Sequence, residues 1–248
     1  MKKTNKSVTF AVILTGLVFA SCLKDNVHTG NENGGGTEQP TPPPVPVEKW
    51  VDLGLPSGLL WATYNVGATK PEEYGGYYAW GATSSSGAFI WSTCPYCNAN
   101  QGRHFTKYCN MSLYGDNGYT DNLIVLQPCD DVATVQWGDG ARIPTKEEWL
   151  ELIDNCTCES FVQNDIPGFL ITAPNGKSIF LPAAGYYPGY DRYKVRVSGF
   201  YWSSSLYTDK PFQAWRFTIS NPLMAGADHV YPLERAMGLS VRPVRSAH

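Results

Sequence analysis

Two cysteines separated by two residues are the most conspicuous chemical feature of the chain. Cys94-Pro95-Tyr96-Cys97 matches the redox dithiol sequence of glutaredoxins letter for letter. That chemistry needs the first thiol at a helix N-terminus, where the helix dipole lowers its pKa. Residues 98–102 carry no apolar periodicity and end in a glycine, and no strand–helix unit precedes the pair. The sequence therefore favours structural cysteines over a redox site.

Other catalytic and metal-binding chemistries have little support. Zinc would need a second paired set of cysteine or histidine ligands, which the C-x2-C pair lacks. The sequence contains no G-x-S-x-G, H-E-x-x-H, P-loop or dinucleotide fingerprint. A glycosidase needs two carboxylates across a cleft, and nothing in the sequence pairs Asp191, Asp209 or Asp228. We therefore expect no catalytic residue, metal ion or cofactor.

Aromatic residues in loops give the best indication of function. Residues 186–193, with the sequence YYPGYDRY, lie between two predicted strands and show no periodicity. Exposed rings supply contact area at low entropy cost, and interleaved polar groups give specificity. The alternative is that many of these rings pack in a β-rich core. The candidate recognition loops are 186–193 and 206–231, and the candidate ligand-binding residues are Tyr187, Tyr190, Asp191, Arg192, Tyr193, Trp215, Asp228 and His229.

Few helices are predicted to position these loops. Thr145 and Glu148 have the spacing of a capping box, and apolar residues at 149, 152, 153 and 156 form an amphipathic face. A shorter helix is predicted over 131–137, with Asp130 and Asp131 at its start and Gly138 at its end.

Strand signals dominate the rest of the chain. Segments 169–172 and 178–181 flank Asn175-Gly176, which is a strong hairpin signature. Further strands are predicted at 50–53, 59–62, 200–202, 214–219 and 239–242. The pattern predicts an α+β fold of irregular, mostly antiparallel sheets with one or two helices and long loops.

The first residues have the features of an export signal. Lys2, Lys3 and Lys6 precede an almost wholly apolar stretch at 8–20. Phe19-Ala20-Ser21-Cys22 resembles a bacterial lipobox, in which cleavage precedes the cysteine and its thiol carries the lipid. We expect a signal peptide at 1–21, a lipid anchor on Cys22, a disordered Gly/Pro-rich tether at 22–49 and one folded domain at 50–245.

Composition excludes several classes of protein. The 248 residues include 19 basic and 22 acidic side chains, and the hydrophobic fraction of 43% is that of a folded protein. The net charge of −3 gives no general attraction to nucleic acid. No apolar run reaches the ~18 residues of a spanning helix, so a multispanning membrane protein is not expected.

The six cysteines left in the domain suggest disulfides, because exported proteins more often use cysteines in this way. We expect a bridge between Cys97 and Cys109. Cys156 and Cys158 are too close in sequence for an easy mutual bridge.

Several blocks of sequence occur in the order typical of one known family. They are VDLGLPSGLLWA at 51–62, NVGA at 65–68, YGGYYAWG at 74–81, DDVA at 130–133, RIPTKEEW at 142–149, IFLPAAG at 179–185, YWSS at 201–204 and VRPVR at 241–245. Together they resemble the Fibrobacter succinogenes major paralogous domain family across about residues 50–245. The resemblance implies a C-type-lectin-like fold, in which strands near the two termini pair and the loops carry function. Members are typically surface lipoproteins of Bacteroidetes and their relatives.

The resemblance does not imply calcium-mediated sugar binding. The triplets of true C-type lectins, E-P-N or Q-P-D followed by W-N-D, are absent from the sequence. We predict a binding module on the bacterial outer membrane, tethered through lipid at Cys22 and facing outward. Its ligand would be a glycan or a surface protein, and it would act as an adhesin or accessory binder. The alternative is a structural or assembly component, such as a fimbrial tip or envelope subunit, and a glycan hydrolase is less favoured.

Overall fold

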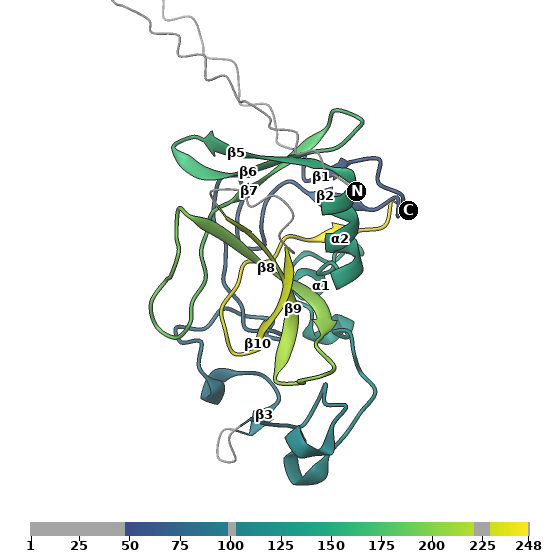
Figure 1. Ribbon diagram of the computed structural model, residues 1–248, viewed down its shortest axis with the longest axis vertical. Coiled ribbons are helices and arrows are strands. Elements are labelled where there is room, and N and C mark those ends of the chain that lie inside the picture. Colours follow the sequence, from purple (N-terminus) through teal and green to yellow (C-terminus); the bar gives the residue numbers. More distant parts are fainter. Residues whose placement is uncertain (1–47, 99–102, 221–228, 248) are drawn as a thin grey trace, which may run out of the picture. The chain divides into compact units, whose positions relative to one another are not determined.

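The described part of the chain comprises residues 48–98, 103–220 and 229–247 of the computed structural model and contains four small sheets, two short α-helices, single-turn 3-10 helices at Trp91–Thr93, Ser112–Tyr114, Asp116–Gly118 and Pro128–Asp130, and long loops (Figure 1). The strands are β1 (Trp50–Asp52), β2 (Leu60–Ala62), β3 (Cys97–Asn98), β4 (His104–Phe105), β5 (Thr157–Gln163), β6 (Ile166–Thr172), β7 (Ser178–Pro182), β8 (Ser198–Leu206), β9 (Gln213–Ser220), β10 (Val230–Glu234) and β11 (Val244–Arg245). The helices are α1 (Val132–Trp137) and α2 (Lys146–Asn155). These elements confirm the predicted α+β class.

The predicted leader, the lipidated Cys22 and the predicted tether up to residue 47 lie outside the described residues. Within the described ranges, neither helix has the length and apolar character needed to cross a membrane.

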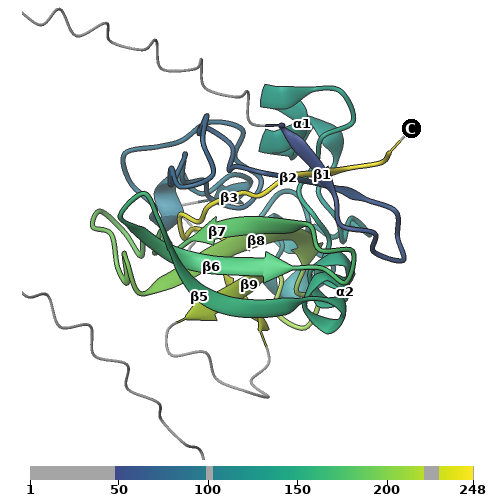
Figure 2. The same ribbon diagram turned by 90° about the horizontal axis from the view of Figure 1, so that it is seen from above.

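Strands from the two ends of the domain share one sheet. β2 pairs antiparallel with both β1 and β11, and Val244 lies opposite Trp61. Figure 2 shows the yellow C-terminal segment running beside β2. The expectation that strands near the termini pair is therefore confirmed. The strand predicted at 239–242 is wrong, because Leu239 bridges Tyr78 and Ser240 bridges Tyr201 before pairing with β2 begins.

The predicted hairpin at Asn175-Gly176 is present between β6 and β7. Phe169 pairs with Leu181, and Gly176 has a positive φ of 80° that suits glycine in the turn. The sheet also contains β5, which pairs antiparallel along the whole of β6 and was not predicted. β5 lies at the edge of this sheet, in the order β5-β6-β7.

A third sheet, in the order β10-β9-β8, lies against α2. The Trp149 ring of α2 stacks on the Phe217 ring of β9 with centroids 4.5 Å apart. Successive side chains of a strand point to opposite faces, so Arg216 lies on the face of β9 away from Phe217. On that second face, Ala214 joins the core cluster that contains Trp80, Tyr108 and Trp202.

Candidate recognition surface

The predicted recognition loop is held rigidly at its base. Tyr186 and Tyr193 exchange two backbone hydrogen bonds, N–H of Tyr186 to the Tyr193 carbonyl at 3.0 Å and N–H of Tyr193 to the Tyr186 carbonyl at 2.8 Å. Tyr187 makes a similar pair of bonds with Gly238, at 2.9 and 3.0 Å. The Gly189 carbonyl accepts a further bond from the backbone of Phe89 at 2.9 Å. The loop is thus fixed to two other segments of the domain.

The tyrosines of this loop divide into packing and exposed residues. The Tyr187 ring lies edge-on to Tyr77 at 4.9 Å and is tilted against Phe89 at 5.2 Å, so it serves the core. Tyr190 is 68% exposed and Tyr193 is 53% exposed. Tyr190 and Tyr193 are therefore the rings of the loop that a ligand can reach.

The charged residues of the loop are exposed. Asp191 and Arg192 both lie at the surface. Arg192 lies beside the phenol of Tyr77, and this contact raises the pKa of the guanidinium, whereas burial lowers it. Arg192 therefore leans toward the Tyr77 side of the loop.

Arg216 of β9 is the residue that sequence reasoning missed. Its guanidinium lies 5.1 Å from the centroid of the Phe200 ring and 6.0 Å from that of Tyr231. Nε and Nη1 are buried and have no hydrogen-bond partner. Burial lowers the pKa of Arg216 to about 10, and the nearby phenols of Tyr186 and Tyr231 oppose that shift. The one indication of this residue in the sequence was that Arg216 is a charged side chain within the predicted strand 214–219.

Contacts between rings join the loop to the strands. Tyr186 lies 5.8 Å from Tyr193 and 4.6 Å from Phe200, measured between ring centroids. Tyr231 lies directly across from Arg216 in the pairing of β10 with β9, and it is 41% exposed. We call Tyr186, Tyr193, Phe200, Arg216 and Tyr231 the tyrosine–arginine surface. It brings together the two predicted recognition regions, 186–193 and 206–231.

Two other candidates lie away from this surface. Trp215 points to the opposite face of β9, where it packs against the core and lies 5.0 Å from Tyr207 and 3.9 Å from the Lys146 ammonium. His229 Nδ1 lies 3.2 Å from the carbonyl oxygen of Thr218, and its ring lies 6.0 Å from Phe217. Both residues therefore belong with the α2 side of the sheet. Asp228 lies outside the described residues.

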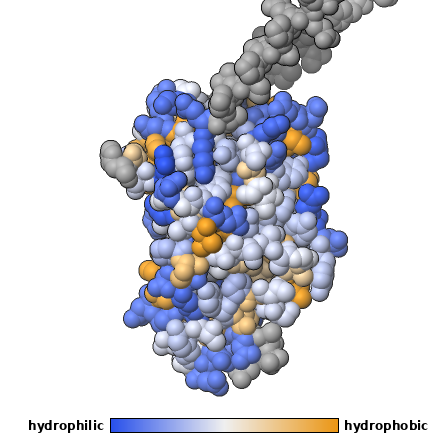
Figure 3. Space-filling model, turned by 180° about the vertical axis from the view of Figure 1, so that it is seen from behind, coloured by the Kyte–Doolittle hydropathy of each residue, from blue (hydrophilic) through white to orange (hydrophobic). Residues whose placement is uncertain are grey.

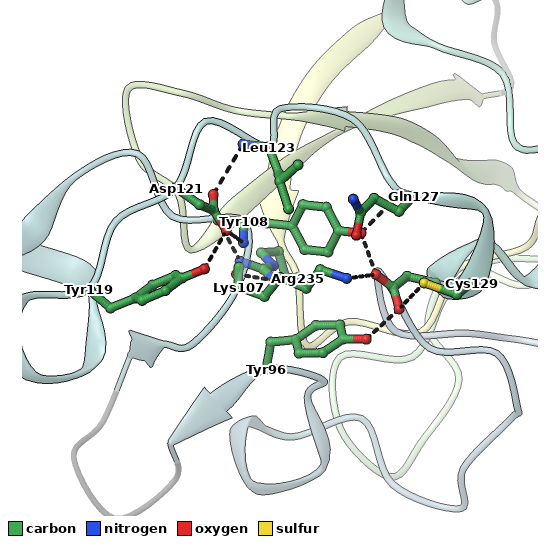
Figure 4. Close-up of polar contacts among 10 residues, drawn as sticks. Tyr96, Lys107, Tyr108, Tyr119, Asp121, Leu123, Gln127, Cys129 and Arg235 are labelled. Atoms are coloured by element: carbon green, nitrogen blue, oxygen red, sulfur yellow. Dashed lines mark hydrogen bonds and ion pairs between the residues drawn. The ribbon is translucent and has the colours of Figure 1, made fainter.

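A polar network around Asp130 connects Tyr96 with Lys107 and Tyr108; Figure 4 labels these donors. The Asp130 carboxylate accepts hydrogen bonds from the phenols of Tyr96 and Tyr108 and from the Lys107 ammonium, the last at 2.5 Å. The Cys129 thiol donates to the same carboxylate at 3.5 Å. Asp130 is buried, and both of its carboxylate oxygens accept hydrogen bonds. We therefore assign this network to the scaffold.

Asp121 organises the same segment from the other side of Tyr108 (Figure 4). Its carboxylate accepts the backbone N–H groups of Tyr108, Cys109 and Leu123 and the phenol of Tyr119, at 2.7 to 3.2 Å. Asp121 thus fixes the backbone around Tyr108, and Asp130 fixes the side chains of Tyr96, Lys107 and Tyr108, so the two aspartates hold residues 103–130, which contain little regular structure.

The described cysteines bear on two predictions, the Cys97–Cys109 disulfide and the absence of a redox role for the pair Cys94 and Cys97. Cys109 is a thiol, and its Sγ donates to the Met111 carbonyl at 3.2 Å, so the expected Cys97–Cys109 disulfide is not formed. Cys94 is followed by a turn and then by β3, not by a helix. Burial raises the pKa of the Cys94 thiol to about 12. The environment therefore disfavours the thiolate that redox catalysis needs.

An apolar pocket of about 290 Å³ lies beside α1. Its walls include Val125, Leu126 and Ile143, with Ser204 at one side. The carboxylate in this pocket belongs to Asp131, which accepts the backbone N–H groups of Ala133, Thr134 and Ile143 at 2.7 to 3.1 Å. Asp131 therefore caps α1, as predicted from the sequence.

Comparisons of the chain with models of protein families, with curated proteins and with solved structures gave no match in any of the three.

Proposed function

We propose that the protein is a lipid-anchored binding module on the outer surface of a bacterial outer membrane, and that it binds a glycan through the tyrosine–arginine surface. The observation that carries this proposal is the unpartnered guanidinium of Arg216 beside the exposed Tyr231 ring, with the exposed Tyr193 ring connected to it through Tyr186 and Phe200. Exposed rings next to a fixed polar group suit the apolar face and the hydroxyls of a sugar.

The rigidity of the loop supports the same proposal. Backbone hydrogen bonds from Tyr186, Tyr187 and Gly189 fix the loop before any ligand arrives. A preorganised site spends less binding free energy on ordering its own residues.

The face of the molecule seen in Figure 3 carries its apolar side chains in small separate patches. That face therefore offers no broad apolar contact surface.

The resemblance to the Fibrobacter succinogenes major paralogous domain family supports the cellular setting. We propose membership of this family and a C-type-lectin-like fold, because the matching blocks run in family order and β2 pairs with β11. The leader-like residues 1–21 and Cys22 support attachment to the membrane through lipid.

A binding measurement tests the proposed site. The full chain in detergent micelles should bind at least one glycan or mucin on an array. Replacing Tyr193→Ala should weaken that binding roughly tenfold, because a stacking ring contributes about 1.4 kcal/mol. Phe161→Ala removes an exposed ring from β5, well away in sequence, and should leave binding unchanged. Equal loss in both variants, or no glycan bound at all, would refute the proposal.

A fractionation experiment tests the anchor. In cells, Cys22→Ala should move the protein from the membrane fraction to the soluble fraction, because the thiol that carries the lipid is removed. Cys129→Ala, which removes an exposed thiol of the domain, should leave the protein on the membrane. Retention of Cys22→Ala on the membrane would show that another feature attaches the chain.

One observation favours the alternative of an assembly component. β5 is an edge strand on which Phe161 is 42% and Val162 is 61% exposed. Open edge strands pair readily with strands of another chain. Partner subunits that co-purify in stoichiometric amounts, and are lost from Val162→Lys, would support assembly over glycan binding.

A further inference from the structure

Buried arginines in this domain differ in how their charge is accommodated. Arg242 donates to Asn65 Oδ1 at 2.9 Å and to the carbonyls of Ala62 and Phe180, both at 3.0 Å. Arg235 donates through Nη1 to the carbonyls of Tyr108 and Pro211, at 3.2 and 3.1 Å. These two residues tie distant segments together, so their burial has a structural explanation.

Arg216 has no such explanation. Nε and Nη1 lie buried without a partner, and no ion pair joins Arg216 to a carboxylate within the described ranges. Removing a guanidinium from water without hydrogen bonds costs free energy that packing alone does not return. Such a residue, placed beside the buried ring of Phe200 and the exposed ring of Tyr231, is typical of a site where stability is given up for function.

The surroundings of Arg216 favour an anion. The chain as a whole has more acidic than basic residues, 22 against 19. At the tyrosine–arginine surface two cations lie close to the rings, Arg216 at 5.1 Å from Phe200 and 6.0 Å from Tyr231 and Lys194 at 5.9 Å from Tyr193, against one acidic residue of the loop, Asp191. The phenols of Tyr186 and Tyr231 lie near the guanidinium and add hydrogen-bonding groups.

The guanidinium attracts a carboxylate through its charge, and its planar group stacks on the Phe200 ring, which holds it in place. Nε and Nη1 are buried, so a ligand oxygen meets Nη2 alone and not the two-nitrogen fork. Tyr231, beside the guanidinium, and Tyr193, beyond Tyr186, provide exposed rings for the apolar face of a sugar.

We propose that Arg216 receives the carboxylate of an acidic sugar, such as a uronic acid within a polysaccharide, while Tyr193 and Tyr231 contact the sugar ring. This inference rests on the proposed glycan-binding function and adds the class of ligand. It goes beyond that function because a neutral sugar could use the same rings without Arg216.

Matched sugars test the carboxylate on the unaltered protein. The full chain in detergent micelles should bind polygalacturonate. Free galacturonate should compete at least tenfold better than galactose, which has the same ring without the carboxylate. Galacturonate should also raise the midpoint of thermal unfolding, because it binds only the folded state. Equal competition by the two sugars would overturn the inference and leave the proposed glycan binding intact.

A substitution locates the carboxylate at Arg216. Arg216→Met keeps much of the volume and removes the charge, so binding to polygalacturonate should fall at least tenfold while the unfolding midpoint stays equal or rises. Arg216→Lys keeps the charge without the planar group that stacks on Phe200 and should retain only part of the affinity. Arg196→Met, at an exposed arginine that donates to the Asp165 carbonyl, is the matched control and should bind normally.

The remaining outcomes separate the two proposals. Full binding by Arg216→Met together with loss in Tyr193→Ala would refute the inference alone. Binding of dextran sulfate but not of polygalacturonate would assign the site to sulfate and would also refute it. Failure to bind any carbohydrate, charged or neutral, would refute both. If Arg216→Met fails to fold, the comparison of galacturonate with galactose on the unaltered chain still decides.

Discussion

Two neighbouring aspartates show how much the surroundings of a residue decide its chemistry. Burial alone would raise the pKa of Asp130, but hydrogen bonds from Lys107, Tyr108 and Tyr96 together lower it. Burial raises the pKa of Asp131, although three backbone N–H groups oppose that shift. The pKa values of these adjacent aspartates are therefore shifted in opposite directions. The Asp130 side chain faces cationic and phenolic donors, whereas the Asp131 side chain is buried at the start of a helix.

This difference predicts a pH-dependent effect of Asp130→Asn. An aspartate whose pKa is lower in the folded state than in the unfolded state stabilises the folded protein. This stabilisation is complete above the unfolded pKa of about 3.9, and it is lost as the pH falls through the pKa of the folded state. At pH 7 the variant should lose about 1–3 kcal/mol of unfolding free energy. Near pH 3 the variant and the unaltered protein should be closer in stability. Urea unfolding at both values measures the difference.

The control is Asp154→Asn on α2, an exposed position where little change is expected at either pH. Asp131 is present in both proteins, so the contribution of its raised pKa to stability is the same in both and cancels from the difference. A loss of stability in Asp130→Asn that is the same at pH 7 and pH 3 would contradict the role given to the ionised carboxylate.

Sequence reasoning could identify Asp131 but not the role of Asp130. A cap is local, because Asp131 bonds to residues two and three positions ahead. The phenol and ammonium donors to Asp130 lie 22 to 34 positions earlier in the chain, in a segment with little periodicity. Arg216 escaped prediction for the same reason, since its surroundings come from three separated segments.

At the scale of single elements, α2 was the most predictable feature. Thr145 Oγ1 accepts the N–H of Glu148 at 3.3 Å, and the Glu148 carboxylate accepts the N–H of Thr145 at 2.8 Å, which confirms the capping box. Glu148 also accepts two bonds from the Arg142 guanidinium, at 2.7 and 2.6 Å. One short pattern therefore fixes both the start of α2 and the strand-like segment before it.

The cap predicts a specific loss on Thr145→Ala. The variant should lose about 1 kcal/mol of unfolding free energy, because the N–H of Glu148 loses its acceptor. For a domain of this size the unfolding midpoint should fall by about 2–4 °C. Thr145→Ser keeps the hydroxyl and should remain near the unaltered protein. Thermal unfolding measures all three, and equal losses for Ala and Ser would show that the hydroxyl is not the cause.

Other elements lacked a readable pattern. β5 has mostly exposed residues, so it shows no alternation of apolar and polar side chains, and it was not predicted. Segment 239–242 is almost fully buried and reads as a strand, yet its backbone bonds with several different segments in turn. A segment that is buried on both sides has an apolar sequence, but that sequence does not predict which strand its backbone will pair with.

At the scale of the whole molecule, Arg242 joins the two ends of the domain to its middle. It links Asn65 and Ala62, near β2, with Phe180 of β7. Val244, two residues later, lies opposite Trp61 in the first sheet. The pairing of terminal strands was expected from the resemblance, but the contact of Arg242 with β7 was not, although Arg242 lies in the block at 241–245.

Arg242→Met should therefore destabilise the entire domain. The substitution leaves three buried oxygens without a donor, and each costs about 1–3 kcal/mol, so the loss should reach several kcal/mol. Arg216→Met is the matched control, since the same change there removes an unpartnered charge and should be neutral or stabilising. Urea unfolding followed by tryptophan fluorescence measures both, and the buried Trp61 and Trp149 report on the shared core. Opposite signs for one chemical change would show that hydrogen bonding, and not burial, separates a structural arginine from one available to a ligand. Similar losses for both variants would contradict that distinction and would place Arg216 in the scaffold as well.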